Sequence, residues 1–183
     1  MYSNILVAVV DYGITTNLKI VLNKLNVPFF IIEPNNYNQI PLYYKKYLPT
    51  HIILSGSQDH VYDDTHKILP NWVINCHIPV LGICYGMQII AHTFGGFVGK
   101  LKEKEKGIYN VIEYMNSQWI NNNRWFNRFD NVYICPENFN IIGYNDKKLI
   151  VAITDNIKYW CVQYHPENPN AIDYNLFRSF LNN

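Results

Sequence analysis

Val80-Leu-Gly-Ile-Cys84-Tyr-Gly-Met-Gln88 contains the most informative pattern in the sequence. Its first four residues are apolar and run directly into the cysteine, which predicts a strand buried on both faces. Gly82 and Gly86 stand two positions before and after Cys84, and an apolar stretch of helical character follows until Gly95-Gly96 ends it. A nucleophile between a buried strand and a helix, with glycines at these positions, has the sequence context of a nucleophile elbow. We therefore expect Cys84 to lie at the carboxyl end of a parallel strand.

The rest of the chain alternates between strand-length apolar runs and amphipathic stretches. In the first half, further strands are expected over residues 5–10, 29–32 and 51–54, and a helix over residues 15–25. This alternation predicts a mainly parallel sheet flanked by helices. In the second half, antiparallel strands without long helices between them are expected over residues 108–114, 132–134, 141–144, 150–153 and 159–163. A closing helix is expected over residues 171–181.

Composition points to one globular domain, residues 1–183, without a strong electrostatic field. The chain is 49% apolar and 16% charged, and 15 Lys and Arg against 14 Asp and Glu leave a formal charge of +1. This balance argues against a nucleic-acid partner. No uninterrupted apolar run is long enough to span a bilayer, so no membrane partner is expected. The four cysteines show no CxxC spacing, and no basic segment precedes residues 5–10, so we expect a reduced, cytoplasmic protein.

Cys84 is the candidate nucleophile. At the start of a helix, unpaired N–H groups and the helix dipole favour the thiolate. The alternative is a buried structural cysteine, which is the usual role of a free cysteine. That alternative suits Cys76 and Cys161, which lack flanking glycines. It suits Cys84 poorly.

The segment Gln163-Tyr-His165-Pro-Glu167 supplies a candidate base. It follows an expected strand, and an extended His-Pro-Glu segment can direct His165 toward Cys84 while Glu167 accepts from the other ring nitrogen. The other five histidines lie in expected strands, loops or a helix and are interpreted as structural or surface residues. No pair of them has convincing metal-ligand spacing, so no metal site is predicted.

Taken together, residues 82–88 and 163–167 resemble the class I glutamine amidotransferases, glutaminases with a Cys-His-Glu triad. The resemblance extends over nearly the whole chain, through residues 10–13, 53–56 and 94–96. It implies a three-layer, flavodoxin-like α/β fold. Within the family, Cys-Tyr-Gly-Met-Gln resembles the glutaminase of GMP synthetase more than that of anthranilate synthase or carbamoyl phosphate synthetase. The compact length matches the free-standing glutaminase subunit of two-subunit GMP synthetases. The resemblance implies that glutamine is the substrate.

The resemblance also implies roles for individual residues. Cys84 would attack the glutamine amide, His165 would transfer protons, and Glu167 would orient His165. The oxyanion would be held by the backbone N–H groups of Ser57 and Tyr85. Two further residues would serve the substrate, since Gly56 would shape the glutamine pocket and Gln88 would contact the bound glutamine.

A separate partner is implied as well. Ammonia would pass to a synthetase chain, an ATP-pyrophosphatase that activates XMP with ATP and magnesium. This chain has no Gly-rich phosphate loop, so no cofactor is expected in it.

Two segments depart from the family pattern. Ser55-Gly56-Ser57-Gln58 stands where the family usually has Ser-Gly-Gly-Pro, and a left-handed backbone at Ser57 would cost about 1–3 kcal/mol. The family's Ser-His-x-Asp segment aligns best with Val132-Tyr-Ile-Cys135-Pro-Glu-Asn138, which contains neither the histidine nor the aspartate. These departures keep other interpretations open.

Three alternatives therefore remain at this point. The chain could be the glutaminase subunit of anthranilate or aminodeoxychorismate synthesis, or a γ-glutamyl hydrolase. It could also be a catalytically weakened amidotransferase that acts in binding or regulation, as Ser57 and Cys135-Pro136 would allow. The charged run Lys100-Leu-Lys-Glu-Lys-Glu-Lys106 is expected to be a solvated loop, with partner docking as the alternative. The asparagine pairs and triplets at residues 35–36 and 121–123 are also expected to be loops.

Overall fold

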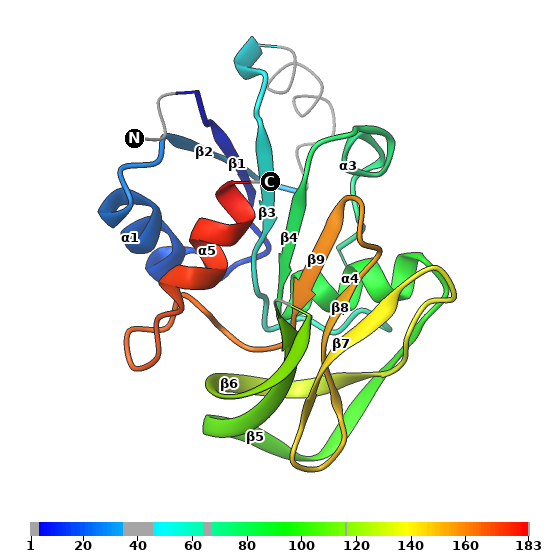
Figure 1. Cartoon of the computed structure of the whole chain (residues 1–183). Helices are drawn as coiled ribbons and strands as arrows, with labels where there is room; N and C mark the ends of the chain where they lie inside the picture. Colours follow the sequence, from blue (N-terminus) through cyan, green and yellow to red (C-terminus); the bar gives the residue numbers. More distant parts are fainter. Residues whose placement is uncertain (1–3, 35–45, 64–66, 116, 183) are drawn as a thin grey trace.

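The computed structural model describes residues 4–34, 46–63, 67–115 and 117–182 of the chain. Within these residues nine strands form one mixed sheet with helices on both faces (Figure 1). From edge to edge the strand order is β2-β1-β3-β4-β9-β8-β7-β5-β6. The predicted fold class, a three-layer α/β sheet with added antiparallel strands, is confirmed.

Parallel strands make up one half of the sheet. They are β1 (Val7–Val10), β2 (Phe29–Ile32), β3 (His51–Leu54), β4 (Val80–Ile83) and β9 (Tyr159–Val162). Every residue of β1, β3 and β4 is buried, as continuous apolar runs predict. The carboxyl ends of parallel strands lie at one edge of the sheet. The segments that follow β3, β4 and β9 therefore meet there, and these three segments carry the candidate residues.

Among the described residues, helices form a layer on each face of the sheet. Helices α1 (Thr16–Lys24) and α5 (Tyr174–Leu181) cover one face, while α3 (Asn71–Asn75) and α4 (Tyr85–Thr93) cover the other (Figure 1). Each face of the sheet has its own apolar core, one containing side chains of α1 and α5 and the other side chains of α3 and α4. Burial on both faces holds the parallel strands, and hence their carboxyl ends, in fixed positions.

The antiparallel half is dominated by one long hairpin. Strands β7 (Asn140–Asn145) and β8 (Ile150–Thr154) extend the sheet from β9, followed by β5 (Phe97–Met115) and β6 (Gln118–Ile134). The β5–β6 hairpin curls across the carboxyl ends of β4 and β9 (Figure 1). The backbone N–H of His165 donates to the Trp125 carbonyl oxygen of β6 at 2.8 Å, so the hairpin forms part of the site.

The hairpin corrects several expectations from the sequence. Residues 108–114 and 132–134 are not separate short strands but parts of β5 and β6. The Lys100–Lys106 run is not a loop, because it lies within β5. Its lysines are exposed on one side, whereas Glu105 is buried and lies opposite Arg128 of β6. In the sequence, a strand that alternates lysine and glutamate and buries only one carboxylate cannot be distinguished from a solvated charged loop when its partner strand is unknown.

Smaller differences occur elsewhere. Residues 121–123 lie within β6 and pair with residues 110–112 of β5, so they are not a loop. Residues 35–36 lie outside the described residues. Helix α5 begins at Tyr174, because Asp173 caps it by accepting from the Leu176 N–H at 3.0 Å.

Candidate active site

Cys84 occupies a strained turn between β4 and α4. Its backbone has φ 52° and ψ −103°, a conformation that residues other than glycine rarely adopt. Its N–H donates to the Val162 carbonyl oxygen of β9 at 2.8 Å. A Cβ at Gly82 would lie 2.9 Å from the Gly86 backbone, and one at Gly86 would lie 2.4 Å from the Leu54 carbonyl oxygen. The two glycines therefore permit the close packing that an elbow requires.

His165 and Glu167 form a buried pair in the segment after β9. The ring Nδ1 of His165 lies 2.8 Å from Oε1 of Glu167. Burial works against a charged ring, yet the neighbouring Cys84 sulfur and the Glu167 carboxylate raise the pKa of His165 well above its usual range. Within the described residues Nε2 is buried and forms no hydrogen bond of ordinary geometry. Glu167 thus holds one side of the ring, and the Cys84 sulfur is its other charged neighbour.

The two expected oxyanion donors come from different elements. Tyr85 is the first residue of α4, so its N–H belongs to the first turn, which has no acceptor within the helix. Ser57 follows β3 and does not have a positive φ, so the strain considered for serine at this position does not arise. Its hydroxyl donates to Asp59 Oδ2 at 2.9 Å and accepts from the Asp59 N–H at 3.1 Å. The serine side chain is thus engaged within its own loop.

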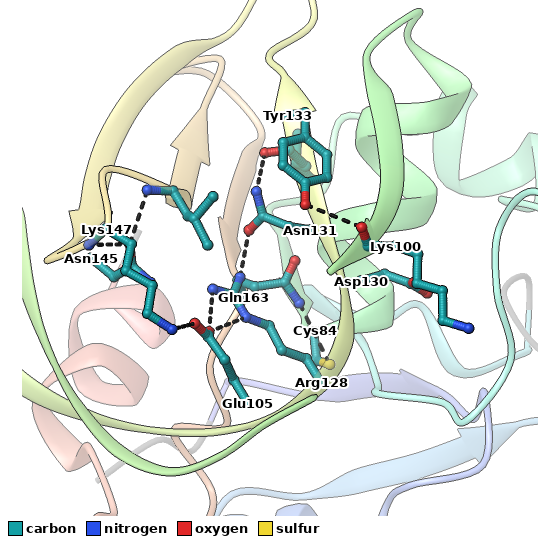
Figure 2. A network of polar contacts seen from close by, with 12 residues as sticks. Cys84, Lys100, Glu105, Arg128, Asp130, Asn131, Tyr133, Asn145, Lys147 and Gln163 are labelled. Atoms are coloured by element: carbon teal, nitrogen blue, oxygen red, sulfur yellow. Dashed lines mark hydrogen bonds and ion pairs between the residues drawn. The ribbon is translucent and has the colours of Figure 1, made fainter. Parts of the chain in front are cut away.

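Gly56 and Gln88 both lie close to the triad. A Cβ at Gly56 would lie 3.0 Å from Cε1 of His165, so the imidazole packs directly on this glycine. Gln88 is buried on α4, and its Nε2 lies 3.3 Å from Oε1 of Gln163. Gln163 in turn approaches the Cys84 sulfur with its Nε2 at 3.6 Å (Figure 2). The structure therefore gathers all seven residues that the sequence singled out around the carboxyl ends of β3, β4 and β9.

A small cavity of about 20 Å³ lies beside Cys84. This volume accommodates about one water molecule and is too small for a glutamine side chain. The lining residues come from the loop after β3, from the elbow and α4, and from β6: Ser57, Gln58, Asp59, His60, Cys84, Gln88, Asn127, Arg128, Phe129 and Asp130. A larger and mainly apolar cavity of about 320 Å³ lies beside α5, and no member of the triad lines it.

The segment of β6 at this cavity is not the one expected from the sequence. Asn127-Arg-Phe-Asp130 lines it, and residues 132–138 do not. Asp130 brings a carboxylate to the cavity lining, and Arg128 brings a guanidinium. Neither residue is predicted from the sequence, because a strand is expected there only over residues 132–134, whereas β6 runs over Gln118–Ile134.

Asp130 is tied to the loop after β3. Its side chain is only 4% exposed, and its carboxylate lies 2.5 Å from Nδ1 of His60. It also accepts from the Tyr62 hydroxyl at 2.8 Å, and the His60 and Tyr62 rings stack with centroids 5.2 Å apart. These contacts, here called the Asp130 clasp, join the loop to β6 across the cavity. The clasp therefore holds this loop against β6 beside the cavity.

Arg128 anchors β6 from behind the cavity (Figure 2). Its wholly buried side chain donates from Nε and Nη2 to Oε2 of Glu105 at 2.9 and 2.7 Å, and from Nη1 to Oδ1 of Asn131 at 2.5 Å. Oε1 of Glu105 accepts from Nζ of Lys147 at 3.0 Å. This network fixes the part of the hairpin that faces Cys84.

Disulfide bonds, clustered metal ligands and membrane-spanning helices are absent from the described residues. The four cysteines are free. Among the residues that the structure describes, no three His, Cys, Asp or Glu side chains are grouped as a metal site would require. No helix in these same ranges is both long enough and apolar enough to cross a membrane.

Comparisons with known proteins identify the family of the chain. The family model for glutamine amidotransferase class I matches residues 8–182. The chain is 31% identical over 167 residues to a GMP synthase [glutamine-hydrolyzing] of Thermosipho melanesiensis, covering 88% of this chain and 32% of that protein. It is 32% identical over 188 residues to the corresponding protein of Finegoldia magna, covering 96% and 36%. The chain thus spans about a third of the length of these curated relatives.

Solved structures show the same fold. A protein of Thermoplasma acidophilum assigned as one subunit of a GMP synthase superposes with a TM-score of 0.83 at 23% identity, covering 97% of this chain and 92% of that one. A glutamine amidotransferase of Thermotoga maritima gives a TM-score of 0.73 at 17% identity, covering 89% and 76%. The match of the family model over residues 8–182, together with the relatives above 30% identity, shows that the chain belongs to the class I glutamine amidotransferase family.

Proposed function

We propose that this chain hydrolyses the side-chain amide of glutamine and supplies ammonia to a synthetase that converts XMP to GMP. The hydrolytic part rests chiefly on the 2.8 Å contact between His165 and Glu167 beside a cysteine held at φ 52°. The GMP part is supported by relatives that are named GMP synthase and share about 30% identity over most of this chain.

The first half-reaction forms a thioester. The Cys84 thiolate attacks the amide carbon of glutamine, and the carbonyl electron pair moves to oxygen, where the N–H groups of Tyr85 and Ser57 would stabilise the negative charge. As the C–N bond breaks, protonated His165 gives its proton to the departing nitrogen, and ammonia leaves. The raised pKa of His165 supports this step, because it favours the protonated ring that the step requires.

The second half-reaction hydrolyses the thioester. Neutral His165 takes a proton from water as the oxygen attacks the thioester carbon, and collapse of the second oxyanion expels the Cys84 thiolate and glutamate. Glu167 holds Nδ1 of His165 in both halves, so Nε2 faces the reacting atoms. The proton that His165 gains here replaces the one that it gave to ammonia.

Glutamine binding requires the cavity beside Cys84 to enlarge. Release of Asp130 by His60 and Tyr62 would open the cavity and free a carboxylate, which would then bind the α-ammonium group of glutamine. Gln88 would contact the substrate from α4, and Gly56 would leave room for it beside His165. The clasp therefore links substrate access to substrate recognition.

The ammonia would be used by a separate ATP-pyrophosphatase. Activation of XMP needs ATP and magnesium, which would bind to that synthetase and not to this chain. We place the reaction in the cytoplasm, where cysteines stay reduced, in keeping with four free thiols. The test for a physiological partner is GMP formation from glutamine, XMP, ATP and magnesium when this chain is mixed with a GMP synthetase that lacks its own glutaminase.

The hydrolytic proposal is tested with an affinity label. The glutamine analogue 6-diazo-5-oxonorleucine should add covalently to Cys84, as peptide mass spectrometry would show, and Cys84→Ala should release no glutamate from glutamine. Cys161→Ala is a matched control, because Cys161 is also buried but lies within β9 and does not line the cavity. Ammonia release by Cys84→Ala at the wild-type rate would refute the proposal. GMP formation from ammonium salts but not from glutamine would refute the partnership alone.

A further inference from the structure

A buried ionic cluster lies behind His165 and has no role in the reaction described so far. Its members are Glu113 of β5, Arg124 of β6, Tyr164 and Asp173. The side chains of Glu113, Arg124 and Asp173 are 6%, 11% and 8% exposed, and Tyr164 is fully buried. None of the four lines the cavity beside Cys84.

Arg124 joins two separate parts of the fold. Its Nε and Nη2 lie 2.8 and 2.7 Å from Oε2 of Glu113, which is on the hairpin. Its Nη1 lies 2.6 Å from Oδ2 of Asp173, the residue that caps α5. A planar guanidinium can hold two carboxylates in fixed directions in this way, whereas a lysine ammonium acts as a point charge. The hairpin and the start of α5 are therefore coupled through one side chain.

The two carboxylates that Arg124 joins also hold the neighbours of His165. Oε1 of Glu113 accepts from the Tyr164 hydroxyl at 2.7 Å, and the Arg124 guanidinium lies 4.9 Å from the centre of the Tyr164 ring. On the other side, the backbone N–H of Asp173 donates to the Pro166 carbonyl oxygen at 2.8 Å. The residues immediately before and after His165 are thus both fixed by the cluster.

We propose that Arg124 is a positioning residue for His165, which it holds in line with Cys84 by tying the hairpin to the start of α5. Residues 163–167 follow the end of β9 and belong to no helix or strand, so their orientation depends on such side-chain contacts. Catalysis needs His165 placed accurately, because a displacement of about 1 Å can reduce a rate roughly 100-fold. The consequence for the rate rests on the proposed glutaminase function, but the placement of His165 does not.

The variant Arg124→Gln tests the proposal with two readouts. First, kcat for glutamine should fall roughly 10- to 100-fold. KM should stay within about twofold, because Arg124 does not line the substrate cavity. Loss of kcat with KM preserved separates misplacement of the base from loss of substrate binding.

The second readout needs no glutamine. Iodoacetamide alkylates the thiolate, and peptide mass spectrometry follows Cys84 separately from the other cysteines. The alkylation rate of Cys84 at mildly acidic pH, divided by its rate at alkaline pH, reports how well His165 stabilises the thiolate. We expect this ratio to fall about tenfold in Arg124→Gln, which corresponds to a loss of thiolate stabilisation of about one pH unit. Among the described residues, the other titratable or charged groups around the pair are Glu167, Asp59, His60, Arg128 and Asp130, and the substitution leaves them in place.

Lys158→Met is the matched control for general destabilisation. Lys158 is a partly buried cation whose Nζ donates to the carbonyl oxygens of Val73, Ile74 and Cys76 at the end of α3, away from His165. The Lys158→Met substitution should lower Tm and leave kcat and the alkylation ratio unchanged. If Lys158→Met changes both readouts as much as Arg124→Gln does, or if Arg124→Gln lowers Tm alone, the proposal is wrong.

A milder variant keeps the test decisive should Arg124→Gln fail to fold. Tyr164→Phe removes only the hydroxyl that binds Glu113, and it should lower kcat and the alkylation ratio in the same direction by a smaller factor. Unchanged values in a folded Tyr164→Phe protein would overturn the proposal. If the wild-type chain hydrolyses no glutamine, the proposed function fails, but the alkylation ratio still decides whether Arg124 positions His165.

Discussion

Gly86 lies two residues after the candidate nucleophile Cys84. One added methyl group at this position should push α4 away from the end of β3. A Cβ there would lie 2.4 Å from the Leu54 carbonyl oxygen and 2.9 Å from Leu54 Cβ. Ordinary contact begins near 3.4 Å, so α4 and the end of β3 would have to move apart by about 1 Å. Because β3 leads into Gly56 and Ser57, this movement would also displace Ser57 relative to Cys84.

The expected losses follow from that displacement. Overpacking costs about 1–3 kcal/mol, and the reduced entropy of the unfolded chain with alanine offsets about 0.4–1 kcal/mol. We therefore expect Gly86→Ala to lower the free energy of unfolding by roughly 1–2 kcal/mol and Tm by roughly 2–8 °C. A shift of about 1 Å at the reacting groups should lower kcat/KM for glutamine about 100-fold. Urea unfolding and the rate of labelling by 6-diazo-5-oxonorleucine measure the two effects.

Gly96→Ala provides a control at the opposite end of α4. A Cβ there would lie 2.7 Å from the Ile134 carbonyl oxygen and 2.9 Å from that of Ala91, so it also meets backbone but lies away from Ser57. We expect a similar loss of stability with labelling of Cys84 retained. Labelling of Gly86→Ala at the wild-type rate, or an equal loss in Gly96→Ala, would refute the reasoning.

Two further variants probe the surroundings of the cavity. Tyr62→Phe removes the hydrogen bond from the Tyr62 hydroxyl to Asp130, which is worth about 1 kcal/mol. We therefore expect kcat/KM for glutamine, measured by glutamate release, to rise by up to about fivefold. A fall in kcat/KM would mean that the clasp maintains the active arrangement. Glu105→Gln should lower the free energy of unfolding at neutral pH by roughly 3 kcal/mol. Although burial opposes it, Arg128 and Lys147 lower the pKa of Glu105 below its ordinary value of 4.5. The stability that the Glu105 carboxylate contributes is therefore complete above pH 4.5 and is lost as the pH falls through the lower pKa of the folded state. The free energy of unfolding of Glu105→Gln, measured with urea, should therefore depend less on pH in acid than that of the wild type. An equally steep acid dependence in the variant would contradict this.

Local patterns made the fold class and the candidate triad predictable. The run into Cys84 specifies a buried strand, the flanking glycines specify the elbow, and His-Pro-Glu after another strand specifies a base with its orienting carboxylate. All three are signals over a few neighbouring residues. Parallel topology then brings the ends of such strands together, so the proximity of Cys84 and His165 follows from the fold class.

The β5–β6 hairpin could not be recognised in the same way. Alternating Lys and Glu at residues 102–106 satisfies the pattern of a solvated loop and that of a strand equally well, and only Arg128 on the facing strand shows that Glu105 points inward. Residues 132–138, the expected counterpart of the family's Ser-His-x-Asp segment, do not line the cavity beside Cys84. Without the hairpin, neither Asp130 nor Arg128 had a position relative to Cys84.

The sequence by itself determined the family and placed the candidate nucleophile and the candidate base, because short-range order along the chain encodes strand, turn and helix around each of them. Only the tertiary structure decided what surrounds them. The Asp130 clasp joins residues 70 positions apart, and Tyr164 reaches Glu113 across 51 positions. Such contacts depend on the register and curvature of a sheet, which a sequence specifies through the whole set of packing and pairing interactions and not through any local period. The small cavity beside Cys84 and the support behind His165 are therefore properties of the assembled fold.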